Sequence, residues 1–328
     1  MKRTLVVRRE TFPIRGSFRI SRGAKTEAEV VVAELHEGEA VGRGECVPYG
    51  RYGESVDGVV DTLESANEAV FEGLDRAGLI HLMPAGAARN ALDCALWDLE
   101  AKLSGTPAWR LAGLAEPPRP VTTLFTIGID EPAAMARAAR GAHDRPLLKV
   151  KLGADRLIER MRAVRAAAPA ARLLIDFNEG ADFDALRAAG PELAAMGVEM
   201  IEQPLPVGSD SMLADLDYPI PFGADESVHG TEDLADLRGL YRFVNIKLDK
   251  TGGLTAALAM KNRAASEGFG IMIGCMVASS LSMAPAVLLA QGAQFVDLDG
   301  PLLLARDRDP GLRYDGATIQ PPATVLWG

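Results

Sequence analysis

The chain has 328 residues, of which 48% are hydrophobic and 24% are charged, and its formal net charge is −10 at pH 7. These values are typical of a globular protein with one large domain and a smaller one. The negative charge argues against a nucleic acid or an anionic membrane as a partner, and no apolar stretch approaches the roughly 20 residues that span a bilayer. Three widely spaced cysteines and the lack of a signal-peptide pattern predict a reduced, cytoplasmic protein.

The first third of the chain predicts a small α+β unit. Residues 1–50 contain short alternating apolar runs separated by turn residues, which favours an antiparallel sheet. Residues 85–105 then repeat apolar side chains at helical spacing, and Gly105 ends that pattern. We therefore expect an N-terminal capping domain over residues 1–118, which ends within the linker EPPRP. Glycine and charge in FRISRGAKTEAE, residues 18–29, predict a mobile loop that acts as a lid.

From Val121 onward, strand-like apolar runs alternate with helical patterns. Successive runs end about 25 residues apart, which is the spacing of a repeated βα unit. Eight such runs predict an α/β fold, a modified TIM barrel of the (β/α)7β type over residues 119–302. No helix is evident after the last run. We expect residues 303–328 to return to the capping domain and complete it.

Ionisable residues close the predicted strands: Lys151, Asp176, Glu202, Asp225, Lys247 and Asp297. Because the C-terminal ends of barrel strands converge on one face, these side chains should share one site. Asp176, Glu202 and Asp225 would supply hard oxygen ligands for one Mg²⁺ per subunit. Singly, each acid is better explained as a polar strand end that meets solvent; the flanking lysines favour the metal site.

The lysines suggest acid–base chemistry. Lys149 and Lys151 should face the same way because strand side chains alternate, and each ammonium group near the other and near a cation should lower the lysine pKa. Lys247 is expected almost opposite them, with Lys250 as a rival that period two directs to the other face. A base on each side of a metal-held carboxylate could move the α-proton through an enediolate and so invert a stereocentre.

Several motifs resemble those of the enolase superfamily, muconate-lactonizing subgroup, and within it the dipeptide epimerases, above all L-Ala-D/L-Glu epimerases. They include PYGRYGES, LLKVKL, IDFNEG, EQPLP, ADES, VNIKLDKTGGL and DLDGP. The resemblance implies that Lys151 and Lys247 are the acid/base pair and that the three carboxylates bind Mg²⁺. It also implies substrate contacts, namely Lys149, Thr126, Arg22, and the pair Asp297 and Asp299.

Within that resemblance, Asp297 and Asp299 match the motif that holds the α-ammonium group of a dipeptide, as two acceptor carboxylates would. Arg22 matches the arginine that meets a glutamate side chain, a role that Lys25 could share or replace. Phe177 stands where a small residue is more usual, which we interpret as a packing difference. Asn178, Glu179 and Glu226 are expected either to orient ligands or simply to cap strand ends.

The sequence thus predicts a Mg²⁺-dependent dipeptide epimerase that inverts the α-carbon of the C-terminal residue by two-base 1,1-proton transfer. The resemblance implies L-Ala-D/L-Glu as the substrate and the recycling of murein peptides as the setting, and a homo-oligomer is compatible with such barrels. One alternative is a cycloisomerase or a lyase like o-succinylbenzoate synthase on the same scaffold. Another is a Mg²⁺-dependent carboxylate-binding protein without catalytic activity.

Overall fold

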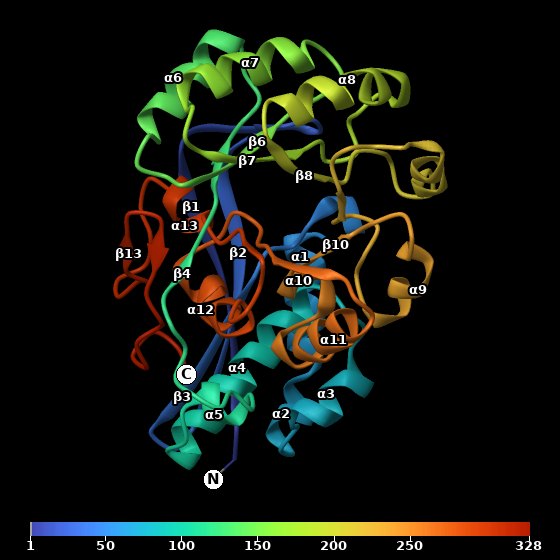
Figure 1. The fold of residues 1–328 in the computed structure, drawn as a ribbon. Helices are drawn as coiled ribbons and strands as arrows, with labels where there is room; N and C mark the ends of the chain where they lie inside the picture. The colour runs from blue at the N-terminus through green and yellow to red at the C-terminus, as the bar shows by residue number, and fades with distance from the viewer. Residues whose placement is uncertain (1) are drawn as a thin grey trace.

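The computed structural model describes residues 2–328 (Figure 1). Its N-terminal part is an antiparallel sheet of β1 (Thr4–Ile20), β2 (Gly23–Glu37) and β3 (Ala40–Cys46). Helices cover this sheet: α1 (Val56–Ser65), α2 (Asn67–Phe71), α3 (Arg76–Leu82) and α4 (Ala87–Ser104). Helix α4 lies so close to β3 that a Cβ atom on Gly44 would stand 2.1 Å from the carbonyl oxygen of Ala91. Gly44 therefore permits this contact, and Gly105 ends α4 with φ +66°, as the sequence predicts.

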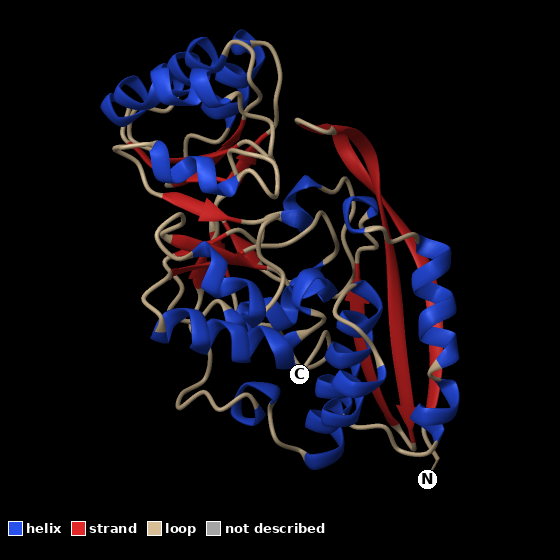
Figure 2. Cartoon of the chain, turned by 90° about the vertical axis from the view of Figure 1, so that its right-hand side faces the viewer, coloured by secondary structure: helices blue, strands red, loops and turns tan. Residues whose placement is uncertain are grey.

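The predicted lid is not a loop. Strands β1 and β2 pair antiparallel as far as Ile20 and Gly23, so only Ser21 and Arg22 form the turn between them. Pairing shifts register between Pro13 and Phe18 and then resumes, which carries the hairpin far beyond the sheet. Figure 2 shows this long hairpin standing beside the barrel. Its tip meets the barrel where Ser21 Oγ donates a hydrogen bond of 2.9 Å to the carbonyl oxygen of Asn178.

The second part is a curled sheet of eight parallel strands in sequential order. They are β5 (Phe125–Ile127), β6 (Leu147–Lys151), β7 (Arg172–Asp176), β8 (Val198–Glu202), β9 (Phe222–Ala224), β10 (Phe243–Ile246), β11 (Gly270–Ile273) and β12 (Phe295–Val296). The first and last strands do not form a ladder, but Leu124 N donates to Val296 O at 2.8 Å and joins the two edges. The predicted α/β fold class, a modified barrel beside an N-terminal sheet domain, is confirmed.

Helices connect most of these strands. The longer ones are α6 (Pro132–Gly141), α7 (Leu157–Ala167), α8 (Phe183–Ala195), α11 (Leu254–Ser266) and α12 (Ser280–Leu289). The other helical segments are short: α5 (Ala108–Leu111), α9 (Leu234–Leu237), α10 (Leu248–Thr251), α13 (Gly300–Leu303), and the 3₁₀ helices η1 (Gly50–Tyr52), η2 (Asp210–Asp215) and η3 (Thr231–Asp233). Within residues 2–328, no helix has the length and apolar character needed to cross a membrane.

Strand alternation positions the site. Leu174 and Met200 belong to an apolar cluster inside the barrel, and each precedes an acidic strand-end residue by two positions. Since side chains two residues apart share a face, Asp176 and Glu202 also point into the barrel. Phe295 and Asp297 repeat the pattern at β12. The interior is therefore apolar below and ionisable at the C-terminal strand ends.

The last residues lie against both parts of the chain. Strand β13 (Tyr314–Asp315) pairs with β14 (Thr318–Ile319), and β14 pairs with β4 (Val121–Thr122), which follows the linker. Further on, Trp327 Nε1 donates to Cys94 O at 2.9 Å and Gly328 N donates to Asp98 Oδ1 at 2.7 Å, both on α4. The tail thus reaches the N-terminal helices, while the domain limits at residues 118 and 302 stay predictions.

Candidate active site at the strand ends

A pocket of about 450 Å³ lies between the barrel and the N-terminal sheet. Strand-end residues line its floor, and the β1–β2 hairpin with the turn η1 lines its opposite wall. Most of the site residues expected from the sequence reach it: Arg22, Thr126, Lys149, Lys151, Asp225, Lys247, Asp297 and Asp299. Asp176 and Glu202 are fully buried and stand behind this lining.

Lys149 connects three carboxylates beneath the pocket. Its Nζ lies 2.7 Å from Asp297 Oδ2, 2.8 Å from Glu202 Oε2 and 2.9 Å from Asp176 Oδ2. Burial by itself lowers the pKa of Lys149, but the carboxylates, Asp176 foremost, outweigh burial and hold that pKa well above its usual value. Negative charge therefore sets the direction of the shift at Lys149, while the expected effect of a bound cation on the pKa of the lysine pair stays a prediction.

Lys151 and Lys247 stand on opposite sides of the pocket. Three strands separate β6 from β10 in one direction around the barrel and three in the other. Lys151 Nζ donates to Asp176 Oδ2 at 2.5 Å and to Asn178 Oδ1 at 3.0 Å. Lys247 Nζ donates to Asp225 Oδ2 at 2.6 Å. Burial lowers the pKa of Lys247, but Asp225 reverses the effect and raises it well above the usual value.

Lys250 is not where period two directs it. The strand stops at Ile246, and residues 248–251 form the single turn α10, so the side chain of Lys250 turns back toward the strand ends. Its Nζ donates to Asp225 Oδ1 at 2.6 Å and to Asn245 O at 2.9 Å. The three-residue spacing of Lys247 and Lys250, read with helical geometry, was the signal that could have found this contact.

The donor chemistry of Asp176, Glu202 and Asp225 suits a hard divalent ion, because carboxylate oxygens are its preferred ligands. Glu202 Oε2 is buried without a well-formed hydrogen bond, although Lys149 Nζ lies 2.8 Å away. Burial and the charge of Asp176 raise the pKa of Glu202 to about 7, so this carboxylate lacks sufficient positive charge around it. Among residues 2–328 no three acid, histidine or cysteine side chains form a ready ligand cluster, and lysine ammonium groups lie between the acids. The residues fit such an ion, and Lys149 occupies part of their binding capacity.

Asp297 and Asp299 follow β12 and line the same pocket. Asp297 Oδ1 is buried and accepts no hydrogen bond, whereas Asp299 Oδ2 accepts from Thr126 N at 2.7 Å. Burial, with Asp297 next, raises the pKa of Asp299 to about 7. Asp297 Oδ2 is paired with Lys149, whereas within residues 2–328 Asp297 Oδ1 and the carboxylate of Asp299 have no cationic partner. A ligand ammonium group would supply one.

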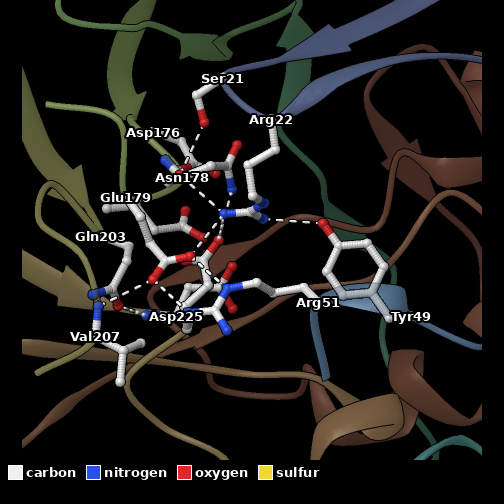
Figure 3. A network of polar contacts seen from close by, with 12 residues as sticks. Ser21, Arg22, Tyr49, Arg51, Asp176, Asn178, Glu179, Gln203, Val207 and Asp225 are labelled. Atoms are coloured by element: carbon white, nitrogen blue, oxygen red, sulfur yellow. Dashed lines mark hydrogen bonds and ion pairs between the residues drawn. The ribbon is translucent and has the colours of Figure 1, made fainter. Parts of the chain in front are cut away.

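A polar network joins the hairpin tip to the barrel (Figure 3). Arg22 Nη1 lies 2.7 Å from Glu226 Oε1, 3.1 Å from Glu179 Oε2 and 2.9 Å from the carbonyl oxygen of Asn178, and Nη2 donates to Tyr49 Oη at 3.0 Å. Arg51 donates to both carboxylate oxygens of Glu179, at 2.7 and 2.8 Å. Burial lowers the pKa of Arg22, but Glu226 and Tyr49 raise it further above its usual value.

Asn178 and Glu179 are more than strand-end caps. Their backbone φ angles are +44° and +69°, values that residues other than glycine rarely adopt. Asn178 N donates to Asp176 Oδ1 at 2.8 Å, and its side chain accepts from Lys151 and donates to Glu226. Asn178 thus contacts both Asp176 and Lys151, while the expectation that these residues orient ion ligands stays a prediction. Phe177 is fully buried in the core, as a packing role requires.

The sequence did not assign roles to Tyr49 and Arg51. Both belong to PYGRYGES in the N-terminal part and meet their partners Arg22 and Glu179 only through space. Glu179 lies 128 residues from Arg51. No local periodicity links such distant positions.

Comparison with known proteins places the chain in a family. Residues 131–323 match the enolase C-terminal domain-like family, and residues 2–113 match the mandelate racemase / muconate lactonizing enzyme N-terminal domain. The chain is 45% identical to L-Ala-D/L-Glu epimerase of Escherichia coli K12, covering 95% of this chain and 98% of that one. It is 44% identical to an N-acetyl-D-glutamate racemase of a Pseudoalteromonas species, covering 91% and 95%.

Solved structures agree with these relatives. An enolase family member from Agrobacterium tumefaciens with homology to dipeptide epimerases, with bound sodium and L-Ala-L-Glu, has a TM-score of 0.98 and 53% identity over 99% of this chain and 100% of that one. A dipeptide epimerase from Enterococcus faecalis, complexed with Mg and L-Leu-L-Tyr, has a TM-score of 0.90 and 27% identity over 98% of both chains. The chain therefore belongs to the enolase superfamily, with both domains of the mandelate racemase and muconate lactonizing type, and it is an isomerase.

Proposed function

We propose that this protein is a Mg²⁺-dependent dipeptide epimerase that inverts the α-carbon of the C-terminal residue of L-Ala-D/L-Glu. One observation carries the proposal: Lys151 and Lys247 line the same pocket from opposite strands of the barrel, with buried carboxylates beneath them. The Escherichia coli relative and the L-Ala-L-Glu held by the Agrobacterium tumefaciens structure support this substrate. Recycling of murein peptides is the physiological setting that we propose.

Asp176, Glu202 and Asp225 would hold the ion. They are oxygen donors on three consecutive strands, and the Mg found in the Enterococcus faecalis neighbour supports this identity. When bound, Mg²⁺ neutralises negative charge that develops on the substrate carboxylate as the α-proton leaves.

Proton transfer is assigned to the two opposed lysines. One removes the α-proton from its face of the substrate, and the other, protonated, delivers a proton to the opposite face, which inverts the centre. Asp176 and Asn178 hold the ammonium group of Lys151, and Asp225 holds that of Lys247. Both nitrogen atoms are thereby kept in place at the pocket wall.

The remaining pocket residues orient the dipeptide. Asp297 and Asp299 would receive the α-ammonium group of the first residue, because Asp297 Oδ1 has no hydrogen-bond partner and Asp299 forms no ion pair within residues 2–328. Lys149 faces the same space and would meet the substrate carboxylate. Lys25 lines the pocket and has no carboxylate within 4.0 Å among residues 2–328, whereas Arg22 already pairs with Glu226 and Glu179. The unpaired charge favours Lys25, with Arg22 beside it, as the contact for an acidic side chain.

Racemisation of N-acetyl-glutamate is a second candidate, favoured by the Pseudoalteromonas relative. Such a substrate has the same glutamate but lacks an ammonium group, so Asp297 and Asp299 would have no partner. The same two acids argue against a cycloisomerase or a lyase. The paired lysines argue against a binding protein without catalysis, which needs no base on either side of a bound carboxylate.

A deuterium experiment tests the proposal. The protein is incubated in D₂O with L-Ala-L-Glu, with Mg²⁺ or with EDTA, and the α-protons are followed by NMR. We expect exchange at the glutamate α-carbon alone, appearance of L-Ala-D-Glu, and loss of both with EDTA. Exchange into N-acetyl-glutamate without exchange into the dipeptide would favour the second candidate. Exchange into neither would contradict both.

A further inference from the structure

Lys250 is a buried lysine that the proposed proton transfer does not use. It is 2% exposed, and its Nζ lies within hydrogen-bond distance of three protein oxygens: Asp225 Oδ1 at 2.6 Å, Asp225 O at 2.6 Å and Asn245 O at 2.9 Å. An ammonium group has three N–H donors, so none remains for a substrate. Lys250 can therefore act only through the residues that it holds.

Each carboxylate oxygen of Asp225 accepts a hydrogen bond from a different lysine. Lys250 takes Oδ1, and Lys247 takes Oδ2 at 2.6 Å. The backbone of Asp225 is fixed as well, because its N–H donates to Gln203 Oε1 at 3.0 Å and its carbonyl oxygen accepts from Lys250. With Oδ1 engaged, the orientation of Oδ2 toward Lys247 follows.

Lys250 also reaches a second proposed ion ligand. Its bond to the carbonyl oxygen of Asn245 fixes the end of β10, and Asn245 Nδ2 donates to Glu202 Oε1 at 2.8 Å. Lys151, in contrast, is held by Asp176 and Asn178, and the hydrogen bonds of Lys250 go to Asp225 and Asn245 instead. The direct contacts of Lys250 thus lie on the Lys247 side of the site.

We infer that Lys250 is a positioning residue that orients Asp225 both for the divalent ion and for Lys247, an inference that rests on the proposed function. The rival explanation is that Lys250 merely supplies a buried countercharge. The two make opposite predictions for ion binding. Removing a positive charge beside Asp225 would strengthen its attraction for Mg²⁺, whereas losing the orientation of Asp225 would weaken binding.

The experiment compares Lys250→Met and Lys250→Gln with Lys261→Met as a matched control. Lys261 is a partly buried lysine on α11 that donates to two backbone carbonyl oxygens, those of Leu289 and Gln291. Mg²⁺ affinity is measured by calorimetry on variants whose circular dichroism matches the parent. The rates of α-deuterium exchange are measured separately for L-Ala-L-Glu and L-Ala-D-Glu.

We expect Lys250→Met to weaken Mg²⁺ binding about tenfold or more, the size seen when groups that orient metal ligands are removed. Exchange should slow about tenfold more for the isomer whose α-proton faces Lys247 than for the other, because a misplaced base affects only its own face of the substrate. Lys250→Gln, which keeps hydrogen-bond donors without the charge, should fall between the parent and Lys250→Met. Lys261→Met should match the parent in both measurements.

Unchanged or tighter Mg²⁺ binding in Lys250→Met would overturn the inference, and so would equal slowing of both isomers. If Lys250→Met does not fold, Lys250→Gln is judged by the same criteria. If the parent exchanges neither dipeptide, the proposed function fails, yet the calorimetric comparison still decides whether Lys250 positions an ion ligand.

Discussion

Arg22, at the tip of the β1–β2 hairpin, forms an ion pair of 2.7 Å with Glu226, the residue that follows Asp225 in the barrel. The carboxylate is almost completely buried, whereas the guanidinium is partly exposed. The hairpin therefore closes over the pocket through charged contacts beside the proposed ion ligands. Contacts of this kind can be exchanged with a charged ligand more readily than an apolar seal.

Glu179 should control how firmly this hairpin is held. It pairs with both Arg22 and Arg51 and accepts a hydrogen bond from Val207 N. Glu179→Gln removes the charge but keeps the shape, so we expect faster amide hydrogen exchange in residues 18–25. The KM for L-Ala-L-Glu should rise several-fold while kcat changes little, because Glu179 touches no reacting atom. Unaltered amide exchange at the tip would show that Glu179 does not restrain it.

The opposed lysines make a face-specific prediction. Lys151→Ala and Lys247→Ala should each lower the rate of epimerisation by about 10³-fold, a typical contribution of a general acid or base. Each variant should still exchange deuterium into one isomer, and the two variants should retain opposite isomers. Exchange is followed by NMR in D₂O, with Lys261→Ala as a control. Retention of the same isomer by both variants would contradict the two-base assignment.

Asp299 separates the two candidate substrates. Asp299→Asn can still accept the hydrogen bond from Thr126 N but carries no charge for an ammonium group. We expect kcat/KM for L-Ala-L-Glu to fall about 10- to 100-fold, the value of a buried charged hydrogen bond. The rate with N-acetyl-glutamate should not fall. A matching loss with both substrates would mean that Asp299 supports the pocket rather than binding the ammonium group.

How much of this site is accessible from sequence depends on the distance between the interacting residues. Strand alternation predicts that Lys149 and Lys151 share a face, and the βα spacing brings Asp176, Glu202 and Asp225 together, because each step uses only local geometry. The sequence pattern does not predict where the side chain of Lys250 lies, because the period changes from strand to helix immediately after Ile246. The pattern does not predict the contact between Arg22 and Glu179 either, because these residues lie 157 positions apart in the sequence.

Asp93 gives a prediction for stability against pH. This buried carboxylate on α4 accepts from Thr255 N at 3.0 Å and from Thr255 Oγ1, at the start of α11. Burial raises its pKa from 3.8 to about 6, although the Thr255 bonds oppose the shift. Below pH 3.8 Asp93 is protonated in both states and has no net effect. As pH rises from about 4 to 6 the unfolded chain ionises first, so stability falls by about 3 kcal/mol and then stays constant.

Asp93→Asn should remove this dependence. The free energy of unfolding, measured with urea, should show the variant gaining relative to the parent between pH 4 and pH 6, and no further gain above that range. Asp61→Asn, at an exposed position of α1, serves as the control. A difference between variant and parent that does not change with pH would refute the assigned pKa of Asp93.

Lys149 leads to a prediction about magnesium and stability. Its ammonium group is the shared partner of Asp176, Glu202 and Asp297, so Lys149→Met leaves three buried acids with less positive charge around them. Removing one member of such a buried set costs about 3–5 kcal/mol, and we expect a correspondingly lower Tm without metal. A ligand that binds only the folded state stabilises it, so Mg²⁺ should raise the Tm of both proteins.

The size of that rise is the informative quantity. In Lys149→Met the ion would replace a missing countercharge, so its Tm should increase more on addition of Mg²⁺ than the Tm of the parent does. Lys151→Met is the matched comparison, because Lys151 contacts Asp176 alone among these acids and should give a smaller effect. Differential scanning fluorimetry with Mg²⁺ and with EDTA measures all three. An equal rise in the three proteins would mean that Lys149 and the ion do not share the same carboxylates.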